Sequence, residues 1–389
     1  MHDRSANRII ELSENREIIV VGAGKNGIQL AEYLLNKGVN IRSFFDNNRF
    51  LYSRTIFGLP VESPRKYEKG NWIYVISTEM PVRDELIEQL ICLGIDKDNI
   101  LVYYPTRSYE YLRSVDENEY QEIITEMFRE NIGYDMSWEK PQTYNELINW
   151  EKIRINDDNR TWLADKVLVK EWVKDKIGER YLVKNIGVYK SVDEIDDEKL
   201  PPKYVLKMNN GSVRNIIVKN KDEIDFYKIK SQLSTWFEKN YAYEFLEMHY
   251  KNIVPQILCE EYLEEFENGA VDYKVYCFHG KPKFIQRIKN EHTELAKALF
   301  YDTEWNPQEF THYYPIDDYV DRPVFLDDML RLTQTLCKDF THVRVDWFVF
   351  PDNTFLFGEM TFSSWAGIQK ILPEKYDLLF GQLITNCDD

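Results

Sequence analysis

The stretch RVDWFVFPDNTFLFGEMTF, residues 344–362, alternates aromatic and β-branched residues on both sides of a central PDNT. This pattern predicts a β-hairpin whose turn is formed by the Asp and Asn of PDNT. The register that follows from this turn places Asp346 directly opposite Glu359 on one face. Two facing carboxylates repel each other, so we expect a cation to lie between them.

Composition indicates a globular chain. The 389 residues are 43% hydrophobic, which suits two or three domains. The formal net charge of -17 argues against a large nucleic-acid or anionic-membrane surface. The first residues lack the apolar core of a signal peptide, and no apolar run approaches the ~18 residues of a membrane span, so we expect a cytoplasmic protein. The five cysteines are scattered without a Cys-x-x-Cys pair, which argues against disulfides and zinc.

Near the N-terminus, residues 17–48 read EIIVVGAGKNGIQLAEYLLNKGVNIRSFFDNN. An apolar strand, a glycine-rich turn, a helix and a second strand predict a βαβ unit. Gly22, Gly24 and Gly27 would allow a tight turn, close approach of a phosphate and close helix packing. Asp46 stands where a ribose-binding acid is expected. The pattern favours a nucleotide-binding site over a tight turn with no ligand.

Strand and helix patterns continue to about Tyr104 and predict a short, doubly wound parallel sheet for residues 1–106. Its motifs GAGKNG and FFDNN resemble those of the small Rossmann-like domains that precede acyltransferase and methyltransferase domains in polysaccharide biosynthesis. The resemblance implies that this domain binds a nucleotide or a nucleotide-sugar. Residues 107–150 are charged and helix-prone, so we interpret them as a helical connector.

The second half of the chain combines helix and strand patterns with lysines. One continuous helix is predicted around Leu163 and Val173. The segment KYVLKMNNGSVRN predicts a strand that carries Lys207 and a polar loop that contains Gly211 and Ser212. Such a loop could close over phosphates, which favours a phosphate ligand for Lys207 over a solvated surface position.

From about Tyr144 to the C-terminus, the chain resembles the TupA-like ATP-grasp family. The matching segments, in order, are YNELINWEKI, ADKVLVKEWV, IGERYLVKNIGVY, LPPKYVLKMNNGS, YKNIVPQILCEEYL, DYKVYCFHGKPKFIQ, and VRVDWFVF with FGEMTF. A collinear set of this kind is more specific than any single motif. The resemblance implies an ATP-grasp catalytic domain of two α+β subdomains over residues 151–389, with ATP and Mg²⁺ as cofactors. It also implies a link to capsule and teichuronopeptide synthesis.

The resemblance assigns nucleotide contacts residue by residue. Lys166 and Lys207 match the two lysines that hold the ATP phosphates. Glu260 matches the acid that receives the adenine amino group, and the backbone of Glu261 and Leu263 would complete adenine recognition. Lysine ammonium groups on flexible stems suit a mobile triphosphate.

A phosphoryl-transfer site follows from the same resemblance. Asp272 falls near the ribose-contacting acid, and Lys274, on the same strand face, falls near a catalytic, phosphate-facing cation. Asp346 and Glu359 match the magnesium ligands, so Mg²⁺ would be the cation expected in the hairpin. Arg344 would stabilise the negative charge of an acyl phosphate and of its tetrahedral adduct.

These residues predict ATP-dependent ligation of a carboxylate to an amine through an acyl phosphate. By resemblance, the carboxylate would belong to a hexuronic acid of a surface polysaccharide or to its nucleotide-linked precursor, and the amine to an amino acid or amino alcohol. Two alternatives stay open. One is an ATP-grasp sugar kinase, and the other is a nucleotide-sugar-binding regulatory or scaffold protein of polysaccharide biosynthesis. We expect small-molecule partners and no nucleic acid.

Overall fold

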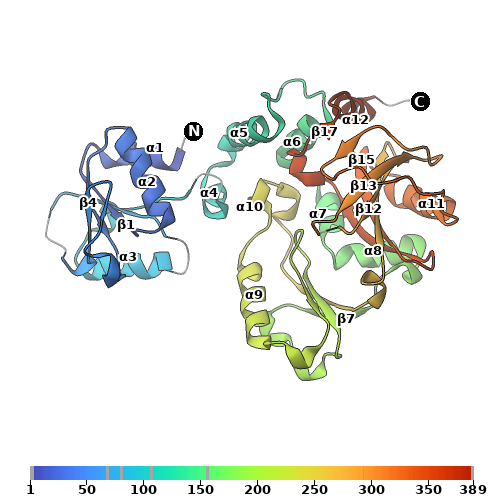
Figure 1. Cartoon of the computed structure of the whole chain (residues 1–389), viewed down its shortest axis with the longest axis horizontal. Helices are drawn as coiled ribbons and strands as arrows, with labels where there is room; N and C mark the ends of the chain where they lie inside the picture. Colours follow the sequence, from blue (N-terminus) through green and yellow to red (C-terminus); the bar gives the residue numbers. More distant parts are fainter. Residues whose placement is uncertain are drawn as a thin grey trace. The chain divides into compact units, whose positions relative to one another are not determined.

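The computed structural model describes residues 4–66, 70–78, 82–105, 108–154, 157–291 and 293–386. The protein consists of two compact units, Met1–Val115 and Asp116–Asp389 (Figure 1). The predicted boundary between residues 106 and 107 lies outside the described residues. In the described part of the sequence, no helix is long and apolar enough to cross a membrane.

The first unit is built on a mostly parallel sheet with the order β3-β4-β2-β1-β5-β6. The strands are β1 (Ile18–Val21), β2 (Ile41–Phe45), β3 (Thr55–Ile56), β4 (Leu59–Glu62), β5 (Ile73–Ile76) and β6 (Ile100–Val102). Among the described strands of this sheet, only β3 and β4 pair in antiparallel fashion. The strand order reverses between β1 and β5, and ligands of such sheets bind beside the carboxyl ends at this point.

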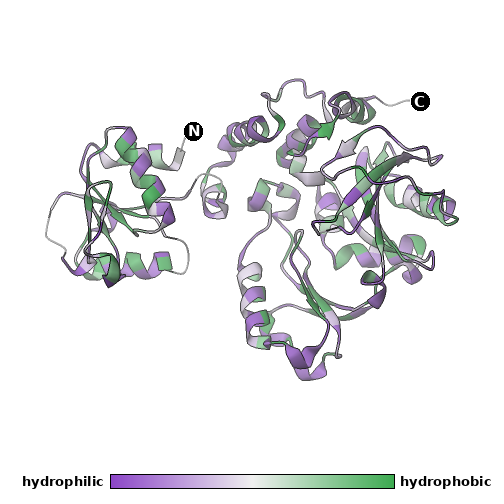
Figure 2. Cartoon of the chain, in the orientation of Figure 1, coloured by the Kyte–Doolittle hydropathy of each residue, from purple (hydrophilic) through white to green (hydrophobic). Residues whose placement is uncertain are grey.

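Helices cover both faces of this sheet. They are α1 (Arg4–Ser13), α2 (Lys25–Asn36) and α3 (Val82–Cys92), and α4 (Tyr109–Ser114) follows the last strand. Val20 packs with α1 and α2, whereas Val21 packs with α3 in a separate core. Successive side chains of a strand point to opposite faces, so a strand covered on both sides is apolar throughout. Figure 2 shows this concentration of hydrophobic residues on the strands.

The second unit contains two antiparallel sheets, with the orders β7-β10-β8-β9 and β13-β12-β11-β15-β16, and a short pair, β14 and β17. The strands of the first sheet are β7 (Asn185–Tyr189), β8 (Tyr204–Met208), β9 (Asn215–Val218) and β10 (Ile257–Glu261). The remaining strands are β11 (Val271–Phe278), β12 (Lys281–Lys289), β13 (Lys297–Asp302), β14 (Thr311–His312), β15 (His342–Val349), β16 (Phe355–Thr361) and β17 (Ile371–Leu372). The predicted combination of an α/β part and an α+β part is confirmed.

Helices bury both faces of the five-stranded sheet. The helices of this unit are α5 (Tyr120–Ile132), α6 (Tyr144–Arg154), α7 (Asp158–Ala164), α8 (Leu168–Ile177), α9 (Phe226–Glu238), α10 (Ala242–Phe245), α11 (Leu326–Cys337) and α12 (Lys375–Thr385). On one face Val275 packs with α8 and α11, and on the other Tyr276 packs with α6 and α12. The smaller sheet packs against α9 through Ile229 and Leu233. Charged residues on the face of Tyr276 therefore lie in a largely dry environment.

The single helix predicted around residues 163–173 is wrong. The chain forms two helices instead, α7 and α8, separated by residues 165–167. The Oδ1 of Asp165 accepts hydrogen bonds from two backbone N–H groups at the start of α8, the shorter of them 2.8 Å long. An Asp that satisfies backbone donors in this way competes with a continuous helix. The break leaves Lys166 outside both helices.

Candidate active site

The predicted hairpin forms, but its register changes in the middle. β15 and β16 pair as expected at Arg344 and Thr361, and the register then shifts by one residue around Asp346. A Cβ on Gly358 would lie 3.1 Å from the backbone oxygen of Asp346, so the strands approach closely at this bulge. Next to the turn, Val349 pairs with Phe355 rather than with Leu356, so the predicted two-residue turn is wrong. The prediction that Asp346 and Glu359 form a direct cross-strand pair is also wrong, because the bulge shifts the register at Asp346.

Arg344 supplies a cation between the two carboxylates. Its Nε and Nη2 each lie 2.7 Å from an oxygen of Asp346, and Nη2 lies 3.7 Å from Oε1 of Glu359. The Nζ of Lys166 lies 3.6 Å from the other oxygen of Glu359. The Nη1 of Arg344 donates to the hydroxyl of Ser364 at 3.0 Å. Positively charged side chains of the protein itself thus offset the repulsion between Asp346 and Glu359 that the hairpin pattern predicts.

The two carboxylates differ in their proton affinity. Burial raises the pKa of Asp346, even though Arg344 and Lys274 are close to it. For Glu359 the same effect of burial is outweighed by nearby cations, Lys166 foremost, which lower its pKa to about 2. Glu359 is therefore ionised at neutral pH, and 34% of its side chain is exposed.

These donors fit a hard divalent cation. Glu359 presents a partly exposed carboxylate, Asp346 offers a second, and the hydroxyl of Thr361 lies 3.0 Å from Glu359. Among the described residues, no group of three or more His, Cys, Asp or Glu side chains is arranged to hold a metal ion. Mg²⁺ is commonly bound by one or two carboxylates together with substrate phosphates, so this donor set suits Mg²⁺ that arrives with ATP.

Lys274, Asp272 and Glu291 extend this charged cluster. Lys274 pairs with Asp346 across β11 and β15, and its Nζ lies 3.7 Å from Asp346 and 2.8 Å from Glu291. Burial and the charge of Glu291 raise the pKa of Asp272 well above its ordinary value. The ribose contact of Asp272 stays a prediction. Sequence reasoning missed Glu291 because it lies in a turn after β12, outside every matched motif.

Glu260 and two lysines form a second cluster on the four-stranded sheet. Glu260 is 4% exposed, its Oε2 lies 2.6 Å from the Nζ of Lys207, and its Oε1 pairs with Lys170. Burial would raise the pKa of Glu260, but the two lysines outweigh it and lower the pKa. Lys170 was not predicted. No local pattern marks it, because its partner Glu260 lies 90 residues further along the chain.

Lys166 connects the helix break with the polar loop after β8. Its backbone N–H donates to the carbonyl of Asn209 at 3.1 Å, and its Nζ donates to the carbonyl of Gly211. Gly211 has a φ of +116°, and a Cβ there would overlap the ring of Tyr241, so packing alone requires glycine. Ser212 is exposed beside it. Phosphate binding by this loop stays a prediction.

The two residues predicted to bind adenine lie where β10 ends. The backbone N–H of Glu261 donates to the carbonyl of Lys184 at 3.0 Å. Leu263 precedes a short 3₁₀ helix, Glu264–Phe266. The backbone leaves the sheet between Glu261 and Leu263, so this segment is no longer part of the strand pairing. The adenine contacts of both residues stay predictions.

In the first unit, the glycine-rich turn joins β1 to α2. Gly22 has a φ of +103°, and a Cβ on Gly27 would overlap the carbonyl oxygen of Gly22. In contrast, a Cβ on Gly24 would meet no atom within 4 Å. The carboxylate of Asp46 accepts a hydrogen bond of 2.8 Å from the N–H of Ala23 and so holds the turn. Gly22 and Gly27 thus have structural roles, whereas the space next to Gly24 is open.

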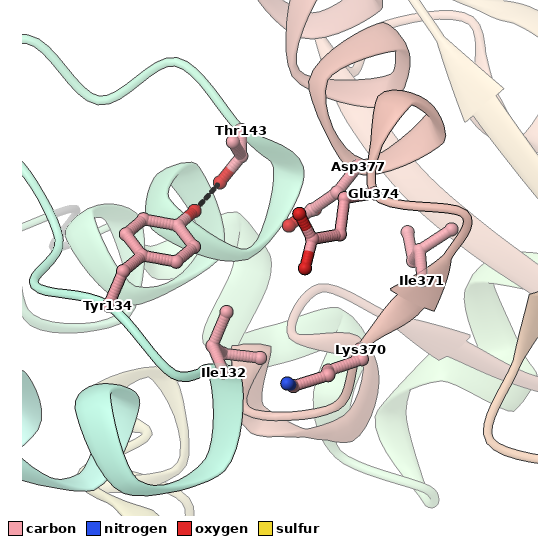
Figure 3. A pocket seen from close by; sticks show the side chains of 7 residues that line it. All are labelled: Ile132, Tyr134, Thr143, Lys370, Ile371, Glu374 and Asp377. Atoms are coloured by element: carbon pink, nitrogen blue, oxygen red, sulfur yellow. Dashed lines mark hydrogen bonds between the residues drawn. The ribbon is translucent and has the colours of Figure 1, made fainter.

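A cavity of about 150 Å³ in the second unit contains none of the predicted site residues. Its lining residues, shown in Figure 3, are Ile132, Tyr134, Thr143, Lys370, Ile371, Glu374 and Asp377. Burial raises the pKa of Asp377 to about 6, and the hydroxyl of Tyr134 lies 3.0 Å from that of Thr143. This cavity therefore plays no part in the assignment of the active site.

Residues 146–385, which carry both charged clusters, match the model of the TupA-like ATP-grasp family. The chain belongs to this family, and the predicted resemblance is confirmed. It is an ATP-grasp enzyme, one of a class of ATP-dependent ligases that use ATP and Mg²⁺. These findings confirm the predicted enzyme class and cofactors.

Several solved structures are similar to this protein at low identity. D-alanine–D-alanine ligase from Bacillus anthracis with ATP has 14% identity, 95% coverage of each chain and a TM-score of 0.34. L-amino acid ligase from Bacillus licheniformis has 10% identity, coverage of 96% of this chain and 76% of that chain, and a TM-score of 0.36. N5-carboxyaminoimidazole synthetase from Staphylococcus aureus with ADP has 13% identity, coverage of 89% and 70%, and a TM-score of 0.32. No curated protein matches this sequence. Because these TM-scores are low, the assignment rests on the family match.

Proposed function

We propose that this ligase joins the carboxylate of a hexuronic acid to the amine of an amino acid or amino alcohol. The acid would belong to a surface polysaccharide or to its nucleotide-linked precursor. The observation that supports ligation is the cluster on the five-stranded sheet, where Arg344 lies 3.7 Å from the ionised Glu359 and Lys274 lies 3.7 Å from Asp346. Bound ATP would supply the phosphoryl group that activates the acid, with Asp346 and Glu359 holding Mg²⁺ against its phosphates.

Side chains of the protein position the reacting groups. Lys166 and Lys207 would bind phosphate oxygens, and each is already held by a carboxylate, Glu359 or Glu260. Arg344 is buried and permanently charged, and Asp346 and Ser364 hold its guanidinium in place. Its charge would stabilise the oxygens that become negative on the substrate carboxyl group. The amine then attacks the activated carbonyl carbon, and phosphate leaves as the amide forms.

The first unit would bind the nucleotide end of a nucleotide-sugar substrate. The open space at Gly24 supports this role, because it lies at the start of the twelve-residue α2. The first N–H groups of a helix have no partner within the helix and attract an anion. The carboxyl ends of β1 and β5 lie at the same switch point of the sheet.

A panel of hexuronates crossed with amines tests the reaction. We expect ADP release and an amide product, identified by mass, only when both an acid and an amine are present. A sugar kinase would instead release ADP and phosphorylate the sugar without any amine.

The variant Arg344→Lys tests the role of the guanidinium in the same assay. It keeps the charge but loses the bidentate fork, so turnover should fall about 100-fold while ATP affinity changes little. Unchanged turnover would remove Arg344 from the mechanism.

A further inference from the structure

Two aromatic residues close to the charged cluster have left-handed backbone conformations. The φ angle of Tyr313 is +75° and that of Trp365 is +51°. Bulky residues rarely adopt positive φ because Cβ crowds the backbone, and such strain gathers at functional sites. Their ring centroids lie 4.2 Å apart with an angle of 32° between the planes. Two strained segments, far apart in the sequence, thus meet through their aromatic rings.

The segment of Tyr313 is tied to the acidic side of the charged cluster. Its neighbour Tyr314 donates a hydrogen bond of 3.1 Å to Oε1 of Glu291. The same oxygen lies 2.8 Å from the Nζ of Lys274, which faces Asp346 across the strands. Tyr313 is therefore one residue away, along the chain, from a direct contact with the cluster.

The segment of Trp365 is tied to its basic side. The preceding residue, Ser364, accepts a hydrogen bond of 3.0 Å from Arg344. The following backbone is held by α6, since Lys152 donates to the carbonyl of Ala366 at 2.9 Å. The backbone on both sides of Trp365 is therefore held in place, one residue along the chain from the contact with the arginine that we assign to the activated carboxyl group.

Burial does not explain the position of Tyr313. This residue is 55% exposed, although the adjacent Tyr314 is 7% exposed and packs in a hydrophobic core. An exposed side chain gains little from packing, so folding alone gives little reason for a tyrosine on strained backbone. A ligand that covers the ring would provide one.

We propose that Tyr313 and Trp365 form a platform that binds the pyranose ring of the sugar acid, an inference that rests on the proposed function. The C–H groups on one face of a pyranose carry partial positive charge, which the negative face of an aromatic ring attracts. Glu291 can accept hydrogen bonds from ring hydroxyls, while Arg344 attracts the carboxylate.

The variant Tyr313→Ala tests the platform, with D-glucuronate as the probe. We expect KM for D-glucuronate to rise about tenfold, with kcat and KM for ATP nearly unchanged, because an aromatic contact contributes to binding of the ring. Tyr313→Phe keeps the ring and should behave like the wild type. Tyr319→Ala removes a tyrosine of similar exposure, 56%, and serves as the matched control.

Calorimetric titration separates the platform from the ligase reaction. The platform is supported if Tyr313→Ala binds D-glucuronate more weakly than the wild type does and all variants bind acyclic D-gluconate poorly. This result would hold even if no amine yields an amide. If the wild type ligates D-glucuronate and Tyr313→Ala leaves both Kd and KM unchanged, the platform is wrong and the ligase proposal stands. The platform is also wrong if the wild type does not bind D-glucuronate. It is wrong as a sugar site if Tyr313→Ala weakens the binding of L-glutamate as much as the binding of D-glucuronate.

Discussion

Both carboxylate oxygens of Asp346 accept hydrogen bonds from Arg344, at 2.7 Å from Nε and 2.7 Å from Nη2. The two residues are neighbours on one face of β15, since side chains two apart in a strand point the same way. Arg344 is 5% exposed and Asp346 is 7% exposed. A buried ion pair of this kind leaves a costly unpaired charge when one partner is removed.

Asp346→Asn should therefore destabilise the ligand-free protein. We expect a loss of about 2–3 kcal/mol in the free energy of unfolding, because Arg344 keeps the hydroxyls of Ser364 and Thr361 as partners. Urea unfolding measures the change, and the stabilisation by Mg²⁺-ATP should also shrink. Asp328→Asn, which alters an exposed pair with Arg331, is the control and should change stability by less than about 0.5 kcal/mol. A variant as stable as the wild type would show that Arg344 does not depend on Asp346.

The two lysines on Glu260 should differ in their roles. Lys170 is 8% exposed and also donates to the carbonyl of Val183 at 2.7 Å, so Lys170→Met should lower the free energy of unfolding by about 3 kcal/mol. The Lys207 side chain is 24% exposed, so Lys207→Met should cost less stability and mainly weaken ATP binding. Urea unfolding and calorimetric titration with ATP measure both effects. A Lys170→Met variant that folds normally but loses ATP binding would make Lys170 a nucleotide ligand instead.

Substitutions in the glycine-rich turn should separate folding from binding. Gly27→Val should unfold the first unit, because even a Cβ there overlaps the carbonyl oxygen of Gly22. Gly24→Val points into open space and should leave the fold intact, yet block the approach of a phosphate. Circular dichroism checks folding, and titration with UDP-glucuronate checks binding. Full UDP-glucuronate binding by Gly24→Val would exclude the turn as the phosphate site.

Asp377 should make stability depend on pH. Burial raises its pKa from 3.8 to about 6, so the folded state binds the proton more tightly and ionisation opposes folding as the pH rises from about 4 through 6. Asp377→Asn keeps an acceptor for the N–H of Asn145, 3.0 Å away, and removes the charge. We expect the variant to be more stable than the wild type by up to about 3 kcal/mol at about pH 8, and by little at about pH 4. An equal difference at both pH values in urea unfolding would contradict this assignment.

The sequence by itself determined the local elements and the class of the protein. The alternation in residues 344–362 predicted the hairpin, but the observed turn alone would not pair Arg344 with Thr361, because the bulge is needed to restore the predicted register. The glycine spacing predicted the turn between β1 and α2. These features depend on residues that are close in the sequence, where periodicity and turn chemistry act directly. The collinear motifs predicted the ATP-grasp family in the same way, from residue order alone.

Only the tertiary structure decided which charges meet. The bulge at Asp346, the pairing of Glu260 with Lys170 and the contact between Lys274 and Glu291 join residues from different elements. The energy of each contact depends on burial and on partners distant in the sequence, which no local pattern specifies. Arg344 lies between the carboxylates because strand pairing brings Glu359 of β16 close to an arginine that already contacts Asp346 on its own strand.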